Sequence, residues 1–254
     1  MTRQRAAIVL GGSGSVGAAL LRELLRDDGF DCVITLSRRS LPEAVAAARK
    51  SGRQLVEKIV PDMRPAPLAA ATLEAAKEFD GDLEGFSVLG VGGGTAKLTL
   101  EQHRAVDVAL NEAFARALRD SGKVQHLAFM SAAGADPTAK ASGSGAAGMP
   151  RYSRVKGESE EAVRASGPAL VSVFRPGMII GSQHTPWLLE KALPLLSFVT
   201  PEKYKSISVD QIAQAMIATA KHHPAASGTY HYPEMMAWIA SSRRSHAPAR
   251  PPNS

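Results

Sequence analysis

A glycine-rich turn near the start of the chain limits the possible folds more than any other feature. The apolar run Ile8-Val9-Leu10 leads into Gly11-Gly12-Ser13-Gly14-Ser15-Val16-Gly17, and an amphipathic segment follows. This order predicts a strand, a tight turn and a helix. In such a turn Gly11 allows a sharp bend, Gly14 lets the backbone approach a pyrophosphate, and Gly17 allows close packing of helix against strand.

The spacing Gly-x-x-Gly-x-x-Gly is a variant of the dinucleotide-binding pattern. Three such glycines also occur in ordinary tight turns, but their position between a strand and a helix favours a nucleotide. The N–H groups and the positive dipole end of the helix would then face the phosphates. We therefore expect cofactor contacts from this turn, at Gly11, Ser13, Gly14, Ser15, Val16 and Gly17.

Strand and helix patterns alternate along the rest of the chain, which predicts an α/β fold with a doubly wound parallel sheet, the Rossmann NAD(P)-binding fold. Further strands are expected at 31–36, 55–60, 85–89, 124–130, 170–174 and 229–232. Helices are expected at 16–25, 67–79, 100–120, 152–165, 187–193 and 209–221. The part after Pro176 is short, so we expect only a small C-terminal substrate region.

The chain has 254 residues, of which 44% are hydrophobic, and this suits one domain with a large core. We expect that domain at 1–240. Within it, 138–150 is almost entirely Ala, Gly, Ser and Lys, which is typical of a flexible loop or insertion. The stretch 241–254 is rich in Ser, Arg, Pro and Ala and is expected to be a disordered tail.

Composition also argues against several classes of protein. The net charge of +6 comes largely from basic residues near the two ends, and aromatics are only 5%, so no basic face for nucleic acid is expected. No apolar run reaches the ~20 residues of a membrane-spanning helix. Five residues precede the first strand, which leaves no room for a targeting peptide, and the one cysteine, Cys32, lies in an apolar run. A cytoplasmic protein is expected, with the nucleus left open.

Two arginines indicate which dinucleotide is bound. An Asp or Glu at the end of the second strand commonly binds the ribose of NAD, but here that place holds Ser37-Arg38-Arg39. Guanidinium groups at Arg38 and Arg39 suit a 2′-phosphate. A solvated arginine pair is the alternative; together with the glycine turn, the pair predicts NADP(H).

A second motif is Tyr152-Ser153-Arg154-Val155-Lys156. On a helix, Tyr152 and Lys156 share a face, and a neighbouring cation lets a phenol exchange a proton with a carbonyl or alcohol. Surface pairs with this spacing are common. Here the motif follows a strand that ends at Ser131, and in this context it is a more specific indication of a catalytic site.

Taken together, these motifs resemble the short-chain dehydrogenase/reductase superfamily, and more closely its atypical branch of Tat-interacting-protein oxidoreductases. The matching phrases are Gly11-x-x-Gly14-x-x-Gly17, Ser37-Arg38-Arg39, Ser131-Ala-Ala-Gly134-Ala135-Asp136, Tyr152-x-x-x-Lys156-Gly157-Glu158 and Val173-Phe174-Arg175-Pro176-Gly177. The resemblance covers about residues 6 to 220.

The resemblance implies roles for individual residues. Tyr152 is implied as the general acid/base, Lys156 as the ligand of the nicotinamide ribose, and Ser131 as a donor to the substrate oxygen. Asp62 and Met63 are implied beside the adenine, the segment Gly90-Val91-Gly92 along the cofactor, and Pro176-Gly177 near the nicotinamide. Hydride chemistry belongs to the cofactor, while these groups position and polarise.

Two functions follow. The complete set of Ser131, Tyr152 and Lys156 favours an enzyme acting on a small carbonyl or alcohol. The short substrate region, and members of this branch that act as regulators, favour an NADP(H)-binding regulator, so a protein partner stays open. Ser131 and Tyr152 are 21 residues apart, which is more than in near relatives, and the segment between them forms either a lid or a tolerated insertion.

No metal site is expected from the spacing of the histidines. His103, His126, His184 and His231 are scattered, and His222-His223 near a helix end suits capping or solvation better than a metal.

Overall fold

The computed structural model describes residues 4–181 and 201–245. Its centre is a seven-stranded sheet in the order β3-β2-β1-β4-β5-β6-β9, and every neighbouring pair is parallel. The strands are β1 (Arg5–Leu10), β2 (Cys32–Ser37), β3 (Gln54–Ile59), β4 (Asp82–Ser87), β5 (Val124–Met130), β6 (Leu170–Phe174) and β9 (Gly228–Tyr230). A separate pair joins β7 (Ile179–Ile180) to β8 (Ile207–Ser208).

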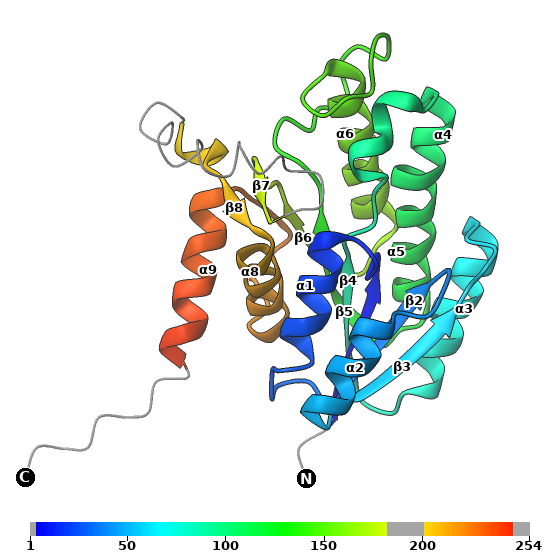
Figure 1. Ribbon diagram of the computed structural model, residues 1–254, viewed down its shortest axis with the longest axis vertical. Helices are drawn as coiled ribbons and strands as arrows, with labels where there is room; N and C mark the ends of the chain where they lie inside the picture. The colour runs from blue at the N-terminus through cyan, green and yellow to red at the C-terminus, as the bar shows by residue number, and fades with distance from the viewer. Residues whose placement is uncertain (1–3, 182–200, 246–254) are drawn as a thin grey trace, which may run out of the picture.

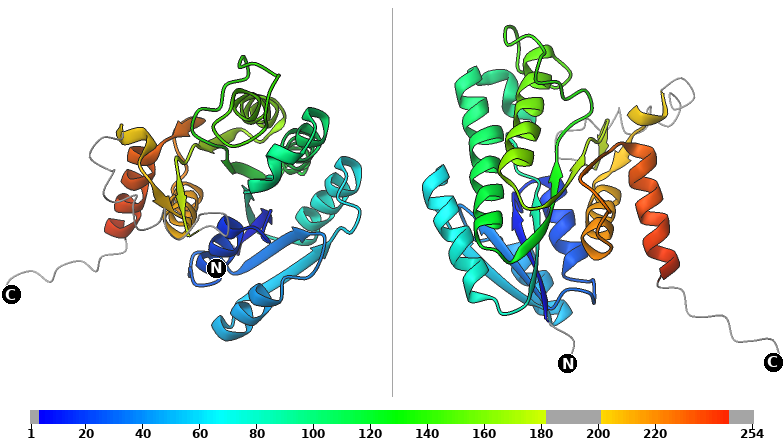
Figure 2. Two further views of the ribbon diagram at one scale, coloured as in Figure 1. Left: turned by 45° about the horizontal axis from the view of Figure 1, so that its top comes forward. Right: turned by 180° about the vertical axis from the view of Figure 1, so that it is seen from behind.

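Helices cover both faces of this sheet (Figures 1 and 2). On one face lie α1 (Ser15–Leu24), α2 (Pro42–Ser51), α8 (Val209–Lys221) and α9 (Tyr232–Ser245). On the other lie α3 (Pro65–Glu78), α5 (Asn111–Asp120) and α6 (Pro150–Ser166). α4 (Leu100–Arg104) and the π-helical turn η2 (Ala105–Leu110) lead directly into α5. Short 3-10 turns are η1 (Gly92–Lys97) and η3 (Glu202–Tyr204).

The central strand β1 shows why the sheet needs a layer of helices on each face. Ala7 and Val9 pack with α1, α8 and α9, whereas Ala6, Ile8 and Leu10 pack with α3 and α5, and all five are buried. Successive side chains of a strand point to opposite faces, so an uninterrupted apolar strand requires an apolar layer on each side. The predicted doubly wound parallel sheet is confirmed.

Two helices differ from the sequence-based expectations. α2 was not predicted, because its buried face consists of the small residues Ala44 and Ala48. α9 runs to Ser245, so the expected start of a tail at Ser241 lies inside a helix whose Met235 and Ile239 are buried in the core. The expected helix at 187–193 falls outside the described residues.

The segment 138–149 consists of turns and bends and contacts its neighbours. Gly145 is buried, and a Cβ there would lie 2.6 Å from the carbonyl oxygen of Thr95 and 2.5 Å from Nη2 of Arg151.

Cys32 is buried, and burial raises the pKa of its thiol to about 11. Among the described residues, none of the helices is long and apolar enough to span a membrane.

Candidate functional site

The expected site residues lie where the strands end. In a parallel sheet all carboxyl ends meet at one edge, and ligands bind there at the point where the strand order reverses. That point lies between β1 and β4. The glycine turn follows β1, Arg38 and Arg39 follow β2, and Ser131 follows β5. Asp62 and Met63 follow β3, Gly90 to Gly92 follow β4, and Pro176 with Gly177 follow β6. Tyr152 and Lys156 lie on the first turns of α6.

The glycine turn has the conformation that its sequence predicts. Gly11 has φ +92°, and a Cβ on it would lie 2.6 Å from the backbone nitrogen of Leu89. A Cβ on Gly17 would lie only 2.1 Å from the carbonyl oxygen of Gly11, so helix and turn are in direct contact. Gly14 and Ser13 are exposed. The turn therefore leaves an open backbone surface where a diphosphate fits.

Helix α1 begins at this turn without a capping side chain. Gly14 is the N-cap residue, no side chain accepts a hydrogen bond there, and the first turn has no acidic residue. The first N–H groups of a helix have no partner within the helix, and together with its dipole they attract anions. This helix end fits the phosphates of a dinucleotide.

The two arginines after β2 are exposed, and Glu57 on the neighbouring strand forms hydrogen bonds with residues other than these arginines. Arg38 and Arg39 are both exposed, and the Ser37 hydroxyl donates to the Arg39 carbonyl oxygen over 2.7 Å. Glu57, from β3, accepts hydrogen bonds from the Leu41 N–H at 2.6 Å and from the Ser40 hydroxyl. The Glu57 carboxylate thus accepts hydrogen bonds from the two residues that precede α2.

Asp62 and Met63 lie beyond the end of β3. Asp62 is paired with Arg64, whose side-chain hydrogen bond holds the pKa of that carboxyl below its usual range. Met63 is partly buried against the core on the α3 side. Asp62 therefore forms an ion pair with Arg64 at the carboxyl end of β3.

Lys156 forms a buried ion pair beside the end of β4. Its Nζ lies 2.6 Å from Oδ1 of Asp107 on η2, and both side chains are almost completely buried. The other carboxylate oxygen of Asp107 accepts from the Val91 N–H at 3.0 Å. A Cβ on Gly90 would lie 3.1 Å from Nζ of Lys156, so this glycine is in close contact with the cation just beyond the strand end.

The ion pair keeps both groups charged. Burial by itself would raise the pKa of Asp107, but the charge of Lys156 and hydrogen bonds to the carboxylate outweigh it and lower that pKa. Burial would likewise lower the pKa of Lys156, yet Asp107 and the neighbouring Tyr152 raise it. Lys156 is thus a permanent cation at the catalytic pH of most enzymes.

A π-helical turn presents Asp107 to this lysine. The π-turn Ala105–Leu110 interrupts the long helix that starts at Leu100. The Asp107 carbonyl oxygen accepts hydrogen bonds from Nδ2 of Asn111 at 2.8 Å and from the Ser159 hydroxyl at 2.5 Å. Such turns occur often at functional sites because they re-aim a side chain within a helix.

The Tyr152 ring lies near this cation and near a buried histidine. Nζ of Lys156 is 5.8 Å from the centre of the Tyr152 ring. The centre of the His103 ring is 5.9 Å from the centre of the Tyr152 ring. Nε2 of His103 lies 3.7 Å from Oδ1 of Asp107. The tyrosine is half-buried.

Ser131 belongs to a second polar group. Its hydroxyl donates to Oε1 of Glu160 over 2.5 Å, and Arg175 donates two hydrogen bonds to the same carboxylate, of 2.8 and 2.7 Å. The hydrogen bond with Glu160 raises the pKa of Arg175. Ser131 is 3% exposed, so its hydroxyl is directed into the protein.

The loops after β5 and β6 are joined by their backbones. The Ala133 N–H donates to the Pro176 carbonyl oxygen over 2.9 Å. Gly177 lies against η3, where a Cβ would come 2.8 Å from the Tyr204 carbonyl oxygen.

Sequence reasoning missed four polar residues of the site. His103, Asp107, Glu160 and Arg175 carry its buried charges and rings, although only Arg175 lies in a phrase of the family resemblance. Glu160 lies four residues after Lys156, and this helical spacing is the one local signal of its position.

Comparison with known families decides the class. A family model described as NAD(P)H-binding matches residues 11–223. The chain belongs to this NAD(P)H-binding family. The match spans the glycine turn, η2, α6 and α8, so it includes every described part of the site.

Fungal relatives of this family member are named as mitochondrial proteins. The chain is 28% identical over 215 residues to "Protein fmp52, mitochondrial" of Aspergillus fumigatus, which covers 82% of this chain and 84% of that protein. It is 30% identical over 185 residues to "Protein fmp52-1, mitochondrial" of Aspergillus terreus, with 72% and 71% covered. The cytoplasmic location expected from the sequence is contradicted by these names and is wrong. The few residues before β1 were not a valid guide to location.

Solved structures share the fold at low identity. A short-chain dehydrogenase/reductase from Serratia marcescens matches with a TM-score of 0.65 and 19% identity, over 92% of this chain and all of that one. The UDP-glucose-4-epimerase of Stenotrophomonas maltophila, solved with bound NAD, matches with a TM-score of 0.62 and 20% identity, over 88% and 76%. These likenesses show the Rossmann-type α/β fold.

Proposed function

We propose that this NAD(P)H-binding protein is an NADP(H)-dependent oxidoreductase of atypical short-chain dehydrogenase/reductase type that acts on a small carbonyl or alcohol. The observation that carries the proposal is the buried Lys156–Asp107 ion pair beside Gly90, one helical turn from the half-buried Tyr152. A cation held next to a phenol at the cofactor edge of the sheet is an arrangement for proton transfer. The closer resemblance to the Tat-interacting-protein oxidoreductases belongs to this proposal.

Each residue then has a defined task. The cofactor supplies or accepts the hydride. Tyr152 gives a proton to the carbonyl oxygen during reduction and takes it back during oxidation. An ammonium has three N–H donors, and the ion pair with Asp107 uses one of them, so Lys156 can also donate to ribose hydroxyls. Asp107 fixes the position of Lys156 and, through the Val91 N–H, that of the loop after β4.

The preference for NADP(H) rests on the second strand end. Arg38 and Arg39 are exposed there, and the nearby Glu57 carboxylate is held by the Ser40 hydroxyl and the Leu41 N–H. A 2′-phosphate would meet two guanidinium groups. Asp62 and Met63 are proposed beside the adenine, and Pro176 with Gly177 near the nicotinamide.

A second function is favoured by one specific observation. The Ser131 hydroxyl donates to Glu160 and Lys156 pairs with Asp107, so two of the three expected catalytic groups already have carboxylate partners. A regulator that binds NADP(H) and is recognised by a protein partner needs no free hydrogen-bond donor for a substrate. The relatives' names also support a mitochondrial location for this chain.

Cofactor binding and turnover test the two functions separately. We expect NADPH to raise the melting temperature more than NADH does. Arg38→Ala should remove that preference, while Arg49→Ala, an exposed arginine on α2, should keep it. Equal stabilisation by NADH contradicts the NADP(H) proposal.

A panel of small aldehydes and ketones then tests for catalysis. Tyr152→Phe should lower the turnover rate about 10²- to 10⁴-fold, which is the usual contribution of a general acid, with NADPH affinity unchanged. Turnover that survives loss of the phenol contradicts the assigned role. NADPH binding without turnover of any carbonyl by the wild type favours the regulator.

A further inference from the structure

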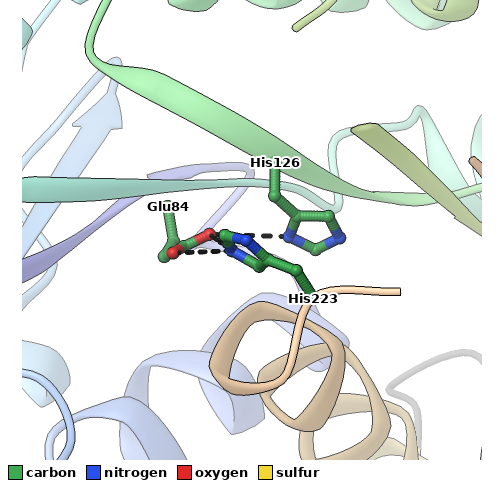
Figure 3. Close-up of side chains that lie close together, drawn as sticks. All are labelled: Glu84, His126 and His223. Carbon is green, nitrogen blue, oxygen red and sulfur yellow. Dashed lines mark hydrogen bonds and ion pairs between the residues drawn. The ribbon is translucent and has the colours of Figure 1, made fainter. Parts of the chain in front are cut away.

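A second polar cluster lies near the amino ends of the strands, at the opposite edge of the sheet from the glycine turn. Glu84 and His126 are the third residues of β4 and β5, near the amino ends of these strands, and His223 follows α8. Figure 3 shows the three side chains converging. Nε2 of His223 lies 2.9 and 3.0 Å from the two carboxylate oxygens of Glu84, and Nδ1 of His126 lies 3.6 Å from Oε2. One ligand atom from each residue falls within 4.8 Å of the other two.

His126 carries an unpartnered nitrogen in the middle of this cluster. The residue is completely buried, and its Nδ1 has no hydrogen-bond partner. Its Nε2 lies 2.8 Å from the Ser172 hydroxyl oxygen on β6. When Nε2–H donates to that oxygen, Nδ1 keeps its lone pair and points it toward Glu84. A buried polar atom without a partner is costly, and here a cation would provide one.

The arrangement around His126 is that of a metal ligand. Metal-bound histidines usually donate their second ring N–H to a neighbouring oxygen, which sets the tautomer and the ring orientation. Ser172 occupies that place. The neutral imidazole ring is the form of histidine that binds metals.

We propose that Glu84, His126 and His223 form a site for a divalent metal ion, and that the ion bound is Zn²⁺. Two imidazoles and one carboxylate are a common set of protein ligands for zinc, with a water molecule in the fourth position. Zn–N and Zn–O bonds of about 2.0–2.2 Å place tetrahedral ligand atoms about 3.3–3.6 Å apart. The observed separations from the Glu84 oxygens to the two histidines are 2.9 to 3.6 Å, and the two histidine ligand atoms lie within 4.8 Å of each other, so the side chains would move together on binding.

The neighbouring charges leave one carboxylate oxygen for the ion. Nη2 of Arg5 donates to Oε1 of Glu84 over 3.2 Å, so the ion would bind Oε2, the oxygen nearest to His126. The positive charge of Arg5 opposes a cation, and we therefore expect a site of moderate affinity. His223 is 32% exposed in its side chain and provides the entry from solvent.

Such an ion would connect parts of the chain that are distant in sequence. It would join β4, β5 and the segment that links α8 to β9, near the amino ends of the strands and away from the carboxyl ends where the cofactor is proposed. The site is independent of the proposed oxidoreductase function, since none of its three ligands comes from the catalytic group.

Cobalt binding tests the site directly. The untagged full chain, treated with a chelator, is titrated with Co²⁺ while visible absorption is recorded, and Zn²⁺ is then added. We expect one Co²⁺ per chain with ligand-field bands, displacement by Zn²⁺, and a higher melting temperature with either ion. A wild-type protein that shows no saturable one-to-one binding overturns the proposal.

Three variants assign the ligands. His223→Ala should weaken Co²⁺ binding by more than about 100-fold, and Ser172→Ala, which removes only the outer partner of His126, by about 10- to 100-fold. His222→Ala, the adjacent histidine outside the cluster, should bind as the wild type does. His223→Gln is used if His223→Ala does not fold. Wild-type affinity in the His223 variant, or equal losses in the His222 and His223 variants, overturns the assignment.

Discussion

Lys156 and Asp107 form an ion pair of 2.6 Å between two side chains that are almost completely removed from water. They are far apart in the sequence, one on α6 and the other on a π-helical turn. Burying two charges is costly, and the cost is offset only when both keep good partners. The pair therefore gives this site a fixed cation beside Tyr152, and its disruption should affect stability strongly.

Asp107→Asn tests the stability of this pair. The amide leaves Lys156 buried without a counter-charge, and we expect a loss of about 3–5 kcal/mol in the free energy of unfolding. The matched control is the double variant Asp107→Asn/Lys156→Met, which removes both charges and should be more stable than the single variant. Urea denaturation measures both. A single variant no less stable than the double variant would mean that the pair is not the dominant buried charge interaction.

The pH dependence of stability follows from the two shifted pKa values. The pKa of Asp107 is lowered on folding, so its contribution is present above the ordinary value of about 4 and is lost as the pH falls below it. The pKa of Lys156 is raised, so its contribution is complete below about pH 10.4 and is lost as the pH rises further. The difference in unfolding free energy between wild type and the double variant should be constant from about pH 5 to 9. It should decrease outside that window; a slope near pH 7 would contradict this assignment of charges.

The sequence was sufficient for the sheet but not for the charged groups around it. Strand β1 is an apolar run followed by turn residues, and this local signal identifies it. α2 escaped notice because its buried face is made of alanines, which give weak periodicity. Asp107 lies in a helix without a motif, and only the packing of η2 against α6 brings it to Lys156.

The cluster of Glu84, His126 and His223 was hidden for the same reason. Its members are separated by 42 residues and then 97 residues, and spacing rules for metal ligands apply to ligands that are close in sequence. Sequence reasoning assigned His223 to a helix end in solvent, whereas its ring contacts the buried Glu84. Parallel strand pairing, which is a property of the whole fold, brings β4 beside β5 and so brings Glu84 near His126.

Two glycines of the turn should separate folding from cofactor binding. A Cβ on Gly17 would lie 2.1 Å from the Gly11 carbonyl oxygen, so Gly17→Ala must displace backbone and should cost about 1–3 kcal/mol of stability. A Cβ on Gly14 would lie 3.7 Å from that oxygen, an ordinary contact, and the φ of Gly14 is −80°. Gly14→Ala should therefore fold with a loss below about 1 kcal/mol but bind NADPH more weakly, because its methyl group occupies the exposed side of the turn. Thermal unfolding with and without NADPH measures both effects. Unchanged NADPH affinity in Gly14→Ala would contradict the proposed position of the diphosphate.

Ser131→Ala asks whether the buried hydroxyl takes part in catalysis. The hydroxyl donates to Glu160, which keeps two hydrogen bonds from Arg175 when the serine is removed, so the stability loss should be only about 1 kcal/mol. If the hydroxyl turns toward the substrate oxygen during reaction, the variant should lose about 10²- to 10³-fold in kcat, the usual effect of removing one donor to a developing oxyanion. Glu160→Gln is the matched control, because its amide oxygen can still accept from Ser131 while the charge partner of Arg175 is lost. A full kcat in Ser131→Ala would show that this serine supports the Glu160–Arg175 pair and nothing more, and Tyr152 alone would then polarise the substrate.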